Sequence, residues 1–180
     1  MRIWSQERYR QAAHVAAEAH QGQLVPGTTL PYLLHLTNVA MELMTALALE
    51  AGHDADLAVQ CALLHDLLED TATTYAELQA SFGPAVAAGV AALTKDSSLD
   101  KAQQMPDSLR RIQQQPPEIW MVKLADRITN MHAPPATWSQ AKRRQYRDEA
   151  ETIHAALHTA SPLLAERLQQ LTRQYARYLD

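Results

Sequence analysis

The sequence predicts an all-α protein, folded as one bundle of about eight or nine helices. Helix-forming Ala, Leu and Gln dominate its 180 residues, and only five glycines and nine prolines punctuate them. Runs that alternate β-branched or aromatic residues with polar ones, which are typical of strands, are missing. At about 100–200 residues per domain, this length favours a single domain over residues 1–180. An apolar content of 47% can supply its core.

Capping residues, prolines and glycines predict the helices of the first half. Ser5 is a candidate N-cap for the first helix, and a loop with two glycines and two prolines follows it over residues 22–31. Thr73 or Thr74 with Glu77 resembles a capping box, which opens a short helix that ends at Gly83. The other helices expected in this half cover residues 4–21, 34–51, 55–70 and 84–94.

Prolines separate the helices of the second half. Pro116 and Pro117 end one helix and open the next, and Pro134 with Pro135 ends that one. Ser161 is the N-cap expected for the last helix, because Pro162 follows it at the first helical position. The expected helices cover residues 101–114, 117–131, 137–159 and 162–178.

Composition excludes several classes of protein. Sixteen Lys and Arg against twenty Asp and Glu give a net charge of −4, which argues against a nucleic-acid binder. Cys61 is the one cysteine, so neither an internal disulfide nor a cysteine zinc cage can form. No targeting sequence and no apolar stretch of about 18 residues is present. We therefore expect a cytoplasmic protein that does not contact a membrane.

An apolar helix carries ionisable residues at its C-terminal end. Residues 57–68 are among the most apolar in the chain, yet His65, Asp66, Glu69 and Asp70 crowd the end of this segment. Carboxylates so close together repel one another, and the helix dipole disfavours anions there. A bound cation would remove both objections. The alternative is a solvated helix end with a core histidine.

Two other segments favour the cation. His35 begins a helix after the Gly/Pro loop, and Asp126 lies in a second apolar helix. With His65 and Asp66 they supply two imidazoles and two carboxylates. Such a mixed N/O set suits Mn²⁺, Fe²⁺ or Zn²⁺, and four protein ligands leave room for water. The candidate metal ligands are therefore His35, His65, Asp66 and Asp126.

The order His, His-Asp, Asp resembles the signature of the HD-domain metal-dependent phosphohydrolases. Further motifs resemble the hydrolase domain of RelA/SpoT-type alarmone enzymes over residues 12–132. They are Ala-His-Gln-Gly-Gln at 19–23, Pro-Tyr-x-x-His at 31–35, Asn38-Val39-Ala40, Ala-Leu-Leu-His-Asp-x-x-Glu-Asp-Thr at 62–71, Phe82-Gly83, Leu93-Thr94-Lys95, and Val-Lys-Leu-Ala-Asp-Arg at 122–127 with Asn130. The tail, with Trp138-Ser139 and Gln145-Tyr146, resembles the small alarmone hydrolases.

The resemblance implies an enzyme of the stringent response that releases pyrophosphate from the 3′ position of (p)ppGpp or (p)ppApp. It implies one Mn²⁺ per chain, with Fe²⁺ or Zn²⁺ as alternatives, on the four ligands named above. Glu69 and Asp70 match the catalytic acidic pair of the family. Lys95, Lys123 and Arg127 are candidates to neutralise phosphate charge, although the last two could also form a surface pair. The residues expected to contact substrate are His20, Lys95, Asn130 and Tyr146.

One segment departs from the family pattern. The family usually has a basic pair in the loop before Pro-Tyr, but Leu24, Val25 and Pro26 stand there, and residues 21–34 contain no Lys or Arg. The sequence therefore does not settle whether the protein recognises guanine, and it favours adenine more than the usual family pattern would. Two alternatives also remain: hydrolysis of another phosphorylated nucleotide such as NADPH, or a non-catalytic alarmone-binding protein. A homo-oligomer is possible, because the two long C-terminal helices offer surface for a partner.

Overall fold

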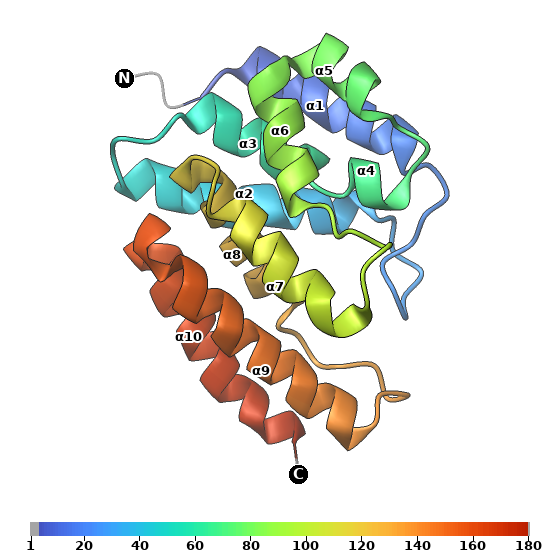
Figure 1. Ribbon diagram of the computed structural model, residues 1–180, viewed down its shortest axis with the longest axis vertical. Helices are drawn as coiled ribbons and strands as arrows, with labels where there is room; N and C mark the ends of the chain where they lie inside the picture. The colour runs from blue at the N-terminus through green and yellow to red at the C-terminus, as the bar shows by residue number, and fades with distance from the viewer. Residues whose placement is uncertain (1–3, 180) are drawn as a thin grey trace.

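Ten α-helices and two 3₁₀ helices make up the regular structure of residues 4–179, the part of the chain that this computed structural model describes (Figure 1). Within these residues, β-structure is limited to an isolated bridge between Leu24 and Pro31. The all-α prediction is therefore confirmed. The elements are α1 (Gln6–Ala19), α2 (Leu33–Leu49), α3 (Ala55–Leu64), α4 (Leu67–Asp70), α5 (Tyr75–Phe82), α6 (Pro84–Leu93), α7 (Lys101–Ile112), α8 (Pro117–Asn130), α9 (Gln140–Leu157), η1 (His158–Ala160), α10 (Pro162–Tyr175) and η2 (Ala176–Tyr178).

The caps expected from the sequence form. The Ser5 and Ser161 side chains each accept a backbone N–H in the first turn of the helix that follows. Thr74 and Glu77 form the reciprocal capping box at the start of α5. Gly83 ends α5 with a φ of 86°, a left-handed conformation that glycine adopts without steric cost. These signals therefore place the helix boundaries within a few residues of where the structure has them.

The helix expected over residues 55–70 is interrupted at its polar end. α3 ends at Leu64, and α4 begins only after His65 and Asp66, the latter with φ −100° and ψ 0°. The His65 Nδ1 atom lies 2.8 Å from the carbonyl oxygen of Ala62, which a continuing helix would offer to the backbone N–H of residue 66. The break splits one expected helix into two and raises the helix count to ten.

α3 is the centre of the bundle, since it packs against α1, α2, α6 and α8. Every residue from Leu57 to Leu64 is buried. α6 comes close to both α3 and α8 at Gly89, where an added Cβ would lie 2.5 Å from Ile119 Cδ1 and 3.0 Å from Cys61 Sγ. Glycine is therefore required at this crossing. Burial raises the pKa of the Cys61 thiol, which fits a core residue.

The C-terminal helices α9 and α10 lie side by side along one flank of the bundle (Figure 1). α10 packs on α8, and Arg167 of α10 makes a two-pronged ion pair with Glu42 of α2, at 2.5 and 2.6 Å. α8 is thereby enclosed between the N-terminal helices and the C-terminal pair. The polar residues of α8 consequently lie at the junction of these two parts.

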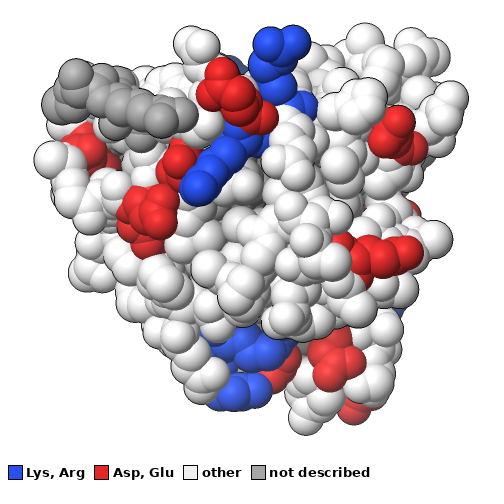
Figure 2. Space-filling view, turned by 90° about the horizontal axis from the view of Figure 1, so that it is seen from above, with Lys and Arg blue, Asp and Glu red and all other residues white. Residues whose placement is uncertain are grey.

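Figure 2 shows one face of the molecule, most of which is covered by uncharged residues. The Lys and Arg side chains on this face lie next to Asp or Glu side chains, and its described residues form no extended basic patch. Among the described residues, no helix has both the length and the apolar character needed to cross a membrane.

Candidate functional site

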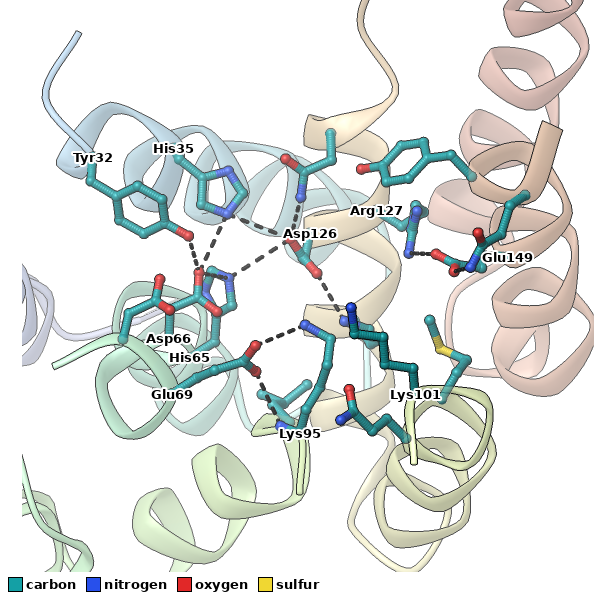
Figure 3. Close-up of a pocket in the computed structure, with 18 residues that line it drawn as sticks. Tyr32, His35, His65, Asp66, Glu69, Lys95, Lys101, Asp126, Arg127 and Glu149 are labelled. Atoms are coloured by element: carbon teal, nitrogen blue, oxygen red, sulfur yellow. Dashed lines mark hydrogen bonds and ion pairs between the residues drawn. The ribbon is translucent and has the colours of Figure 1, made fainter. Parts of the chain in front are cut away.

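A cleft of about 500 Å³ opens where the polar ends of α2, α3, α4 and α6 face α7, α8 and α9 (Figure 3). Of the twelve side chains that the sequence singles out, all except His20 line this cleft. The His20 side chain is buried beside the cleft, with its ring centroid 5.0 Å from that of Tyr32. Segments separated by more than a hundred residues therefore meet at one place.

The four predicted metal ligands converge at the closed end of the cleft. Single donor atoms of His35, His65 and Asp126 all lie within 4.8 Å of one another. The His35 Nε2 atom is 3.5 Å from Asp126 Oδ1 and 3.7 Å from Asp66 Oδ2. The His65 Nε2 atom is 3.0 Å from Asp66 Oδ2 and 3.8 Å from Asp126 Oδ1. Three of the four residues therefore form one close group of donor atoms, and Asp66 Oδ2 lies beside its two imidazole nitrogens.

The break between α3 and α4 prepares His65 for this role. Its Nδ1 atom faces the Ala62 carbonyl oxygen, which can only accept, so Nδ1 keeps its proton and Nε2 is the nitrogen left to bind a cation in exchange for a proton. The imidazole is buried, and within residues 4–179 its Nε2 makes no hydrogen bond of good geometry, although it lies 3.0 Å from Asp66 Oδ2. A buried nitrogen without a hydrogen-bonding partner is costly unless a ligand occupies its lone pair. The donor set and this nitrogen therefore fit a divalent cation.

Each carboxylate at this end is held by a further side chain. Tyr32 Oη donates to Asp66 Oδ2 at 2.5 Å. Asn130 Nδ2 donates to Asp126 Oδ1 at 2.7 Å, and Lys123 Nζ donates to Asp126 Oδ2 at 3.0 Å. Such outer contacts fix the orientation of ligands before a cation arrives.

The charges at this end favour ionised carboxylates. Burial works against a charged imidazole, yet the Asp66 and Asp126 carboxylates raise the pKa of His65 to about 9. Burial also opposes charge on Asp126, but the Lys123 ammonium and the His35 imidazole hold the pKa of this carboxyl well below its usual range. The two carboxylates therefore present negative charge to whatever cation or proton occupies the centre.

The acidic pair on α4 lies on the wall of the cleft, and its two members have different partners. Lys95 holds Glu69 twice: its backbone N–H lies 3.0 Å from Oε2 and its Nζ lies 2.8 Å from Oε1 (Figure 3). Asp70 accepts one hydrogen bond, from the Gln23 amide at 3.0 Å. Both carboxylates line the cleft although a break separates their short helix, α4, from α3.

The wall toward α9 carries groups that the sequence only partly indicated. Arg127 is buried, with its guanidinium carbon 4.3 Å from the centre of the Tyr146 ring. Its Nη2 donates to Glu149 at 3.2 Å, while its Nη1 is buried without a hydrogen bond. Burial raises the pKa of Tyr146 to about 12, although the Arg127 charge acts against the rise. Arg127 and Lys123 are therefore groups of the cleft and do not form a surface pair.

Several lining residues were not identified from the sequence. Tyr32 could have been noticed, since it stands inside the Pro-Tyr-x-x-His motif. Leu93 and Gln145 stand inside quoted motifs, with Lys95 and Tyr146, although the sequence assigned neither a role. Nothing in the local sequence marks the remaining four as cleft residues, because α7 and α9 reach the cleft only through tertiary packing. They are Lys101, Gln104, Met105 and Glu149.

Comparison with known proteins places the chain among named relatives. The family model described as HD domain matches residues 12–164. A zebrafish (Danio rerio) protein named guanosine-3′,5′-bis(diphosphate) 3′-pyrophosphohydrolase MESH1 is 34% identical over 169 residues, which covers 89% of this chain and 90% of the relative. An Aquifex aeolicus guanosine-3′,5′-bis(diphosphate) 3′-pyrophosphohydrolase is 33% identical over 156 residues, which is 84% of this chain and 21% of that larger protein.

A solved structure shows the same fold. It is described as a metazoan ortholog of SpoT that hydrolyzes ppGpp and plays a role in starvation responses. It superimposes with a TM-score of 0.83 at 26% identity, and the match covers 98% of each chain.

Proposed function

The chain belongs to the HD-domain family, and from this membership we propose that it removes the 3′-pyrophosphate of guanosine alarmones with one bound divalent cation. Relatives that match nearly its whole length are named for this activity, which makes the chain a phosphohydrolase. We further propose that residues 1–180 act as one HD-type domain. The observation that carries the proposal is the closed end of the cleft, where a buried His65 Nε2 without a hydrogen bond faces His35, Asp66 and Asp126.

We propose that His35, His65, Asp66 and Asp126 hold this cation, and that it is Mn²⁺. Nitrogen and carboxylate donors without thiolates suit Mn²⁺, and equally admit Fe²⁺ or Zn²⁺. When bound, the cation would supply Lewis-acid chemistry, stabilising charge on a phosphoryl oxygen and making water more acidic.

The side chains of the cleft support a hydrolysis. A water oxygen attacks the phosphorus that is bonded to the 3′ oxygen, that P–O bond breaks, and the 3′ oxygen gains a proton as pyrophosphate leaves. Glu69 and Asp70 are the carboxylates in position to accept the proton of the water and to return one. Lys95, Asn130 and Tyr146 line the same cleft and can bind phosphate or ribose oxygens.

Adenosine alarmones are the second candidate substrate. The loop over residues 22–31 has no Lys or Arg, and its side chains do not line the cleft. The exposed Leu24 and Leu30 cannot replace the donors of an arginine. Discrimination for guanine is therefore expected to be weak in this chain, and we expect ppApp to be hydrolysed alongside ppGpp.

The test is pyrophosphate release by the Mn²⁺-loaded protein from ppGpp, pppGpp, ppApp, pppApp and NADPH in parallel. We expect release from ppGpp, and its loss in a Glu69→Ala/Asp70→Ala double variant. Glu18→Ala/Glu166→Ala removes two exposed carboxylates outside the cleft and should retain activity. Phosphate from NADPH alone would overturn the alarmone assignment. Nucleotide binding without turnover of any compound would identify a binding protein.

A cytoplasmic location and a homo-oligomeric state also remain proposals. Cell fractionation and light scattering on the purified chain would test them. A membrane-associated fraction, or a monomer at all concentrations, would contradict the first and the second respectively.

A further inference from the structure

A chain of three side chains leads from the buried His20 to the acidic pair. The His20 Nδ1 atom lies 2.6 Å from Gln23 Oε1, and Gln23 Nε2 lies 3.0 Å from Asp70 Oδ2. His20 is only 4% exposed and does not line the cleft. A direct contact of His20 with substrate, as the family resemblance suggests, therefore has no support in this geometry.

Chemistry fixes the direction of both hydrogen bonds. An ionised carboxylate only accepts, so the NH₂ group of Gln23 faces Asp70 and its carbonyl oxygen faces His20. That oxygen also only accepts, so His20 carries its proton on Nδ1. The Nε2 atom of His20 is buried and makes no hydrogen bond. The ring is therefore held by its Nδ1 contact and by its tilted contact with the Tyr32 ring.

The backbone fixes Gln23 at the neck of the loop. Its N–H donates to the His20 carbonyl at 3.0 Å, and its carbonyl accepts from the Tyr32 N–H at 2.9 Å. Gly22, with a φ of 82°, makes the tight turn between His20 and Gln23. Both ends of the loop therefore close on Gln23, and the amide is presented to Asp70 from a rigid base.

Asp70 contrasts with its neighbour in the acidic pair. Glu69 is held by the cationic Lys95 through two hydrogen bonds. Within residues 4–179, the neutral amide of Gln23 is the hydrogen-bonding partner of Asp70, and it engages one carboxylate oxygen. An amide orients a carboxylate without neutralising its charge, and leaves the second oxygen available to the cleft.

We propose that His20 and Gln23 are positioning residues that orient Asp70 toward the reacting atoms. This inference rests on the proposed hydrolase function and deepens it, because it gives the Ala-His-Gln-Gly-Gln motif a role in placing the acidic pair. His20 acts through Gln23, and Gln23 acts through Asp70.

The direct test replaces Gln23 by glutamate in the full chain loaded with Mn²⁺. Gln23→Glu keeps the length of the side chain and its acceptor for His20, but presents a carboxylate to Asp70. For ppGpp hydrolysis, we expect kcat to fall about 10–100-fold, the cost typical of a lost outer-shell partner, with KM and Mn²⁺ affinity nearly unchanged. Gln21→Glu adds the same charge on the exposed side of the same turn and should leave kcat unchanged.

A double variant separates positioning from general damage. In an Asp70→Ala background, Gln23→Glu should cause no further loss, because the residue through which it acts is gone. An equal loss in both backgrounds would overturn the proposal, as would an unchanged kcat in Gln23→Glu alone. His20→Asn, whose Nδ2 can replace Nδ1 as the donor, should retain more activity than His20→Leu.

A second measurement is independent of turnover. If the unmodified protein releases no pyrophosphate from ppGpp, the proposed function fails, and the contact is then tested by NMR of the Gln23 side-chain amide. Asp70→Ala should shift this NH₂ resonance, whereas Glu69→Gln should leave it in place. An unshifted Gln23 resonance in Asp70→Ala would overturn the positioning role itself.

Discussion

The two ends of the cleft are built differently. The metal end, where we propose that the cation binds, consists of His35, His65, Asp66 and Asp126, which lie close together with little exposure to solvent. The nucleotide end, where we propose that the substrate extends, consists of residues of α7, α8 and α9 that line the cleft: Lys101, Gln104, Met105, Arg127, Gln145, Tyr146 and Glu149. At the metal end, most donor atoms belong to residues that a further side chain or a backbone carbonyl holds in place. At the nucleotide end, the buried guanidinium of Arg127 is paired with the Glu149 carboxylate.

This difference indicates which end is ready for its ligand. The metal end gathers nitrogen and carboxylate donor atoms within a few ångströms of one another, an arrangement that favours a cation. At the nucleotide end, the Arg127 charge is offset by Glu149, so an incoming phosphate has to share the guanidinium or displace the carboxylate. We therefore expect substitutions at the metal end to act on cation affinity and kcat, and those at the nucleotide end to act on KM.

The largest effect is expected from Asp126→Asn. The amide keeps the shape of the side chain but removes the charge that Lys123 and both histidines face. Since outer-shell changes already cost about 10–100-fold, loss of a ligand should cost at least about 100-fold in Mn²⁺ affinity and in kcat. Calorimetric titration and pyrophosphate release would measure the two. Binding of one Mn²⁺ with unchanged affinity would show that the ligands are elsewhere.

A smaller effect is expected when an outer contact of the metal end is removed. Tyr32→Phe deletes the hydroxyl that donates to Asp66 and should lower Mn²⁺ affinity or kcat about tenfold. Tyr75→Phe removes an exposed hydroxyl on α5 and is the matched control. An effect on KM alone would place Tyr32 at the nucleotide end instead.

Substitutions at the nucleotide end should change KM, and leave Mn²⁺ affinity and kcat nearly unchanged. Arg127→Gln leaves the Glu149 carboxylate facing an anionic substrate, and we expect KM for ppGpp to rise about tenfold, as for loss of a charge-assisted hydrogen bond. Glu149→Gln frees the guanidinium and should leave KM unchanged or lower it. Because Arg127 is buried, thermal unfolding of both variants would show whether a change in KM comes from loss of stability. A fall in Mn²⁺ affinity in Arg127→Gln would show that the two ends do not act separately.

The smallest effect is expected from Leu24→Arg, which restores a basic residue to the uncharged loop. Because an exposed ion pair contributes little, KM for ppGpp should fall by less than about fivefold, with ppApp affected less. Equal changes for both bases would show that this loop does not distinguish guanine from adenine.

The sequence indicated which side chains gather at the metal end better than those at the nucleotide end, for a physical reason. Ionisable residues at the end of the apolar α3 are anomalous within one segment, so His65 and Asp66 could be identified locally. The hydrogen bonds of Gln23 with Asp70 and of Arg127 with Glu149 join residues 47 and 22 positions apart, and no spacing rule encodes them. The break after α3 was missed because it depends on a side chain that binds a backbone carbonyl.

The most direct test of the account is to locate Mn²⁺ by anomalous diffraction from crystals of the full chain. We predict one strong peak, within bonding distance of His35 Nε2, His65 Nε2, Asp66 and Asp126. A peak at the neighbouring His154 and His158 of the C-terminal helices, with none at the four predicted ligands, would contradict the central claim.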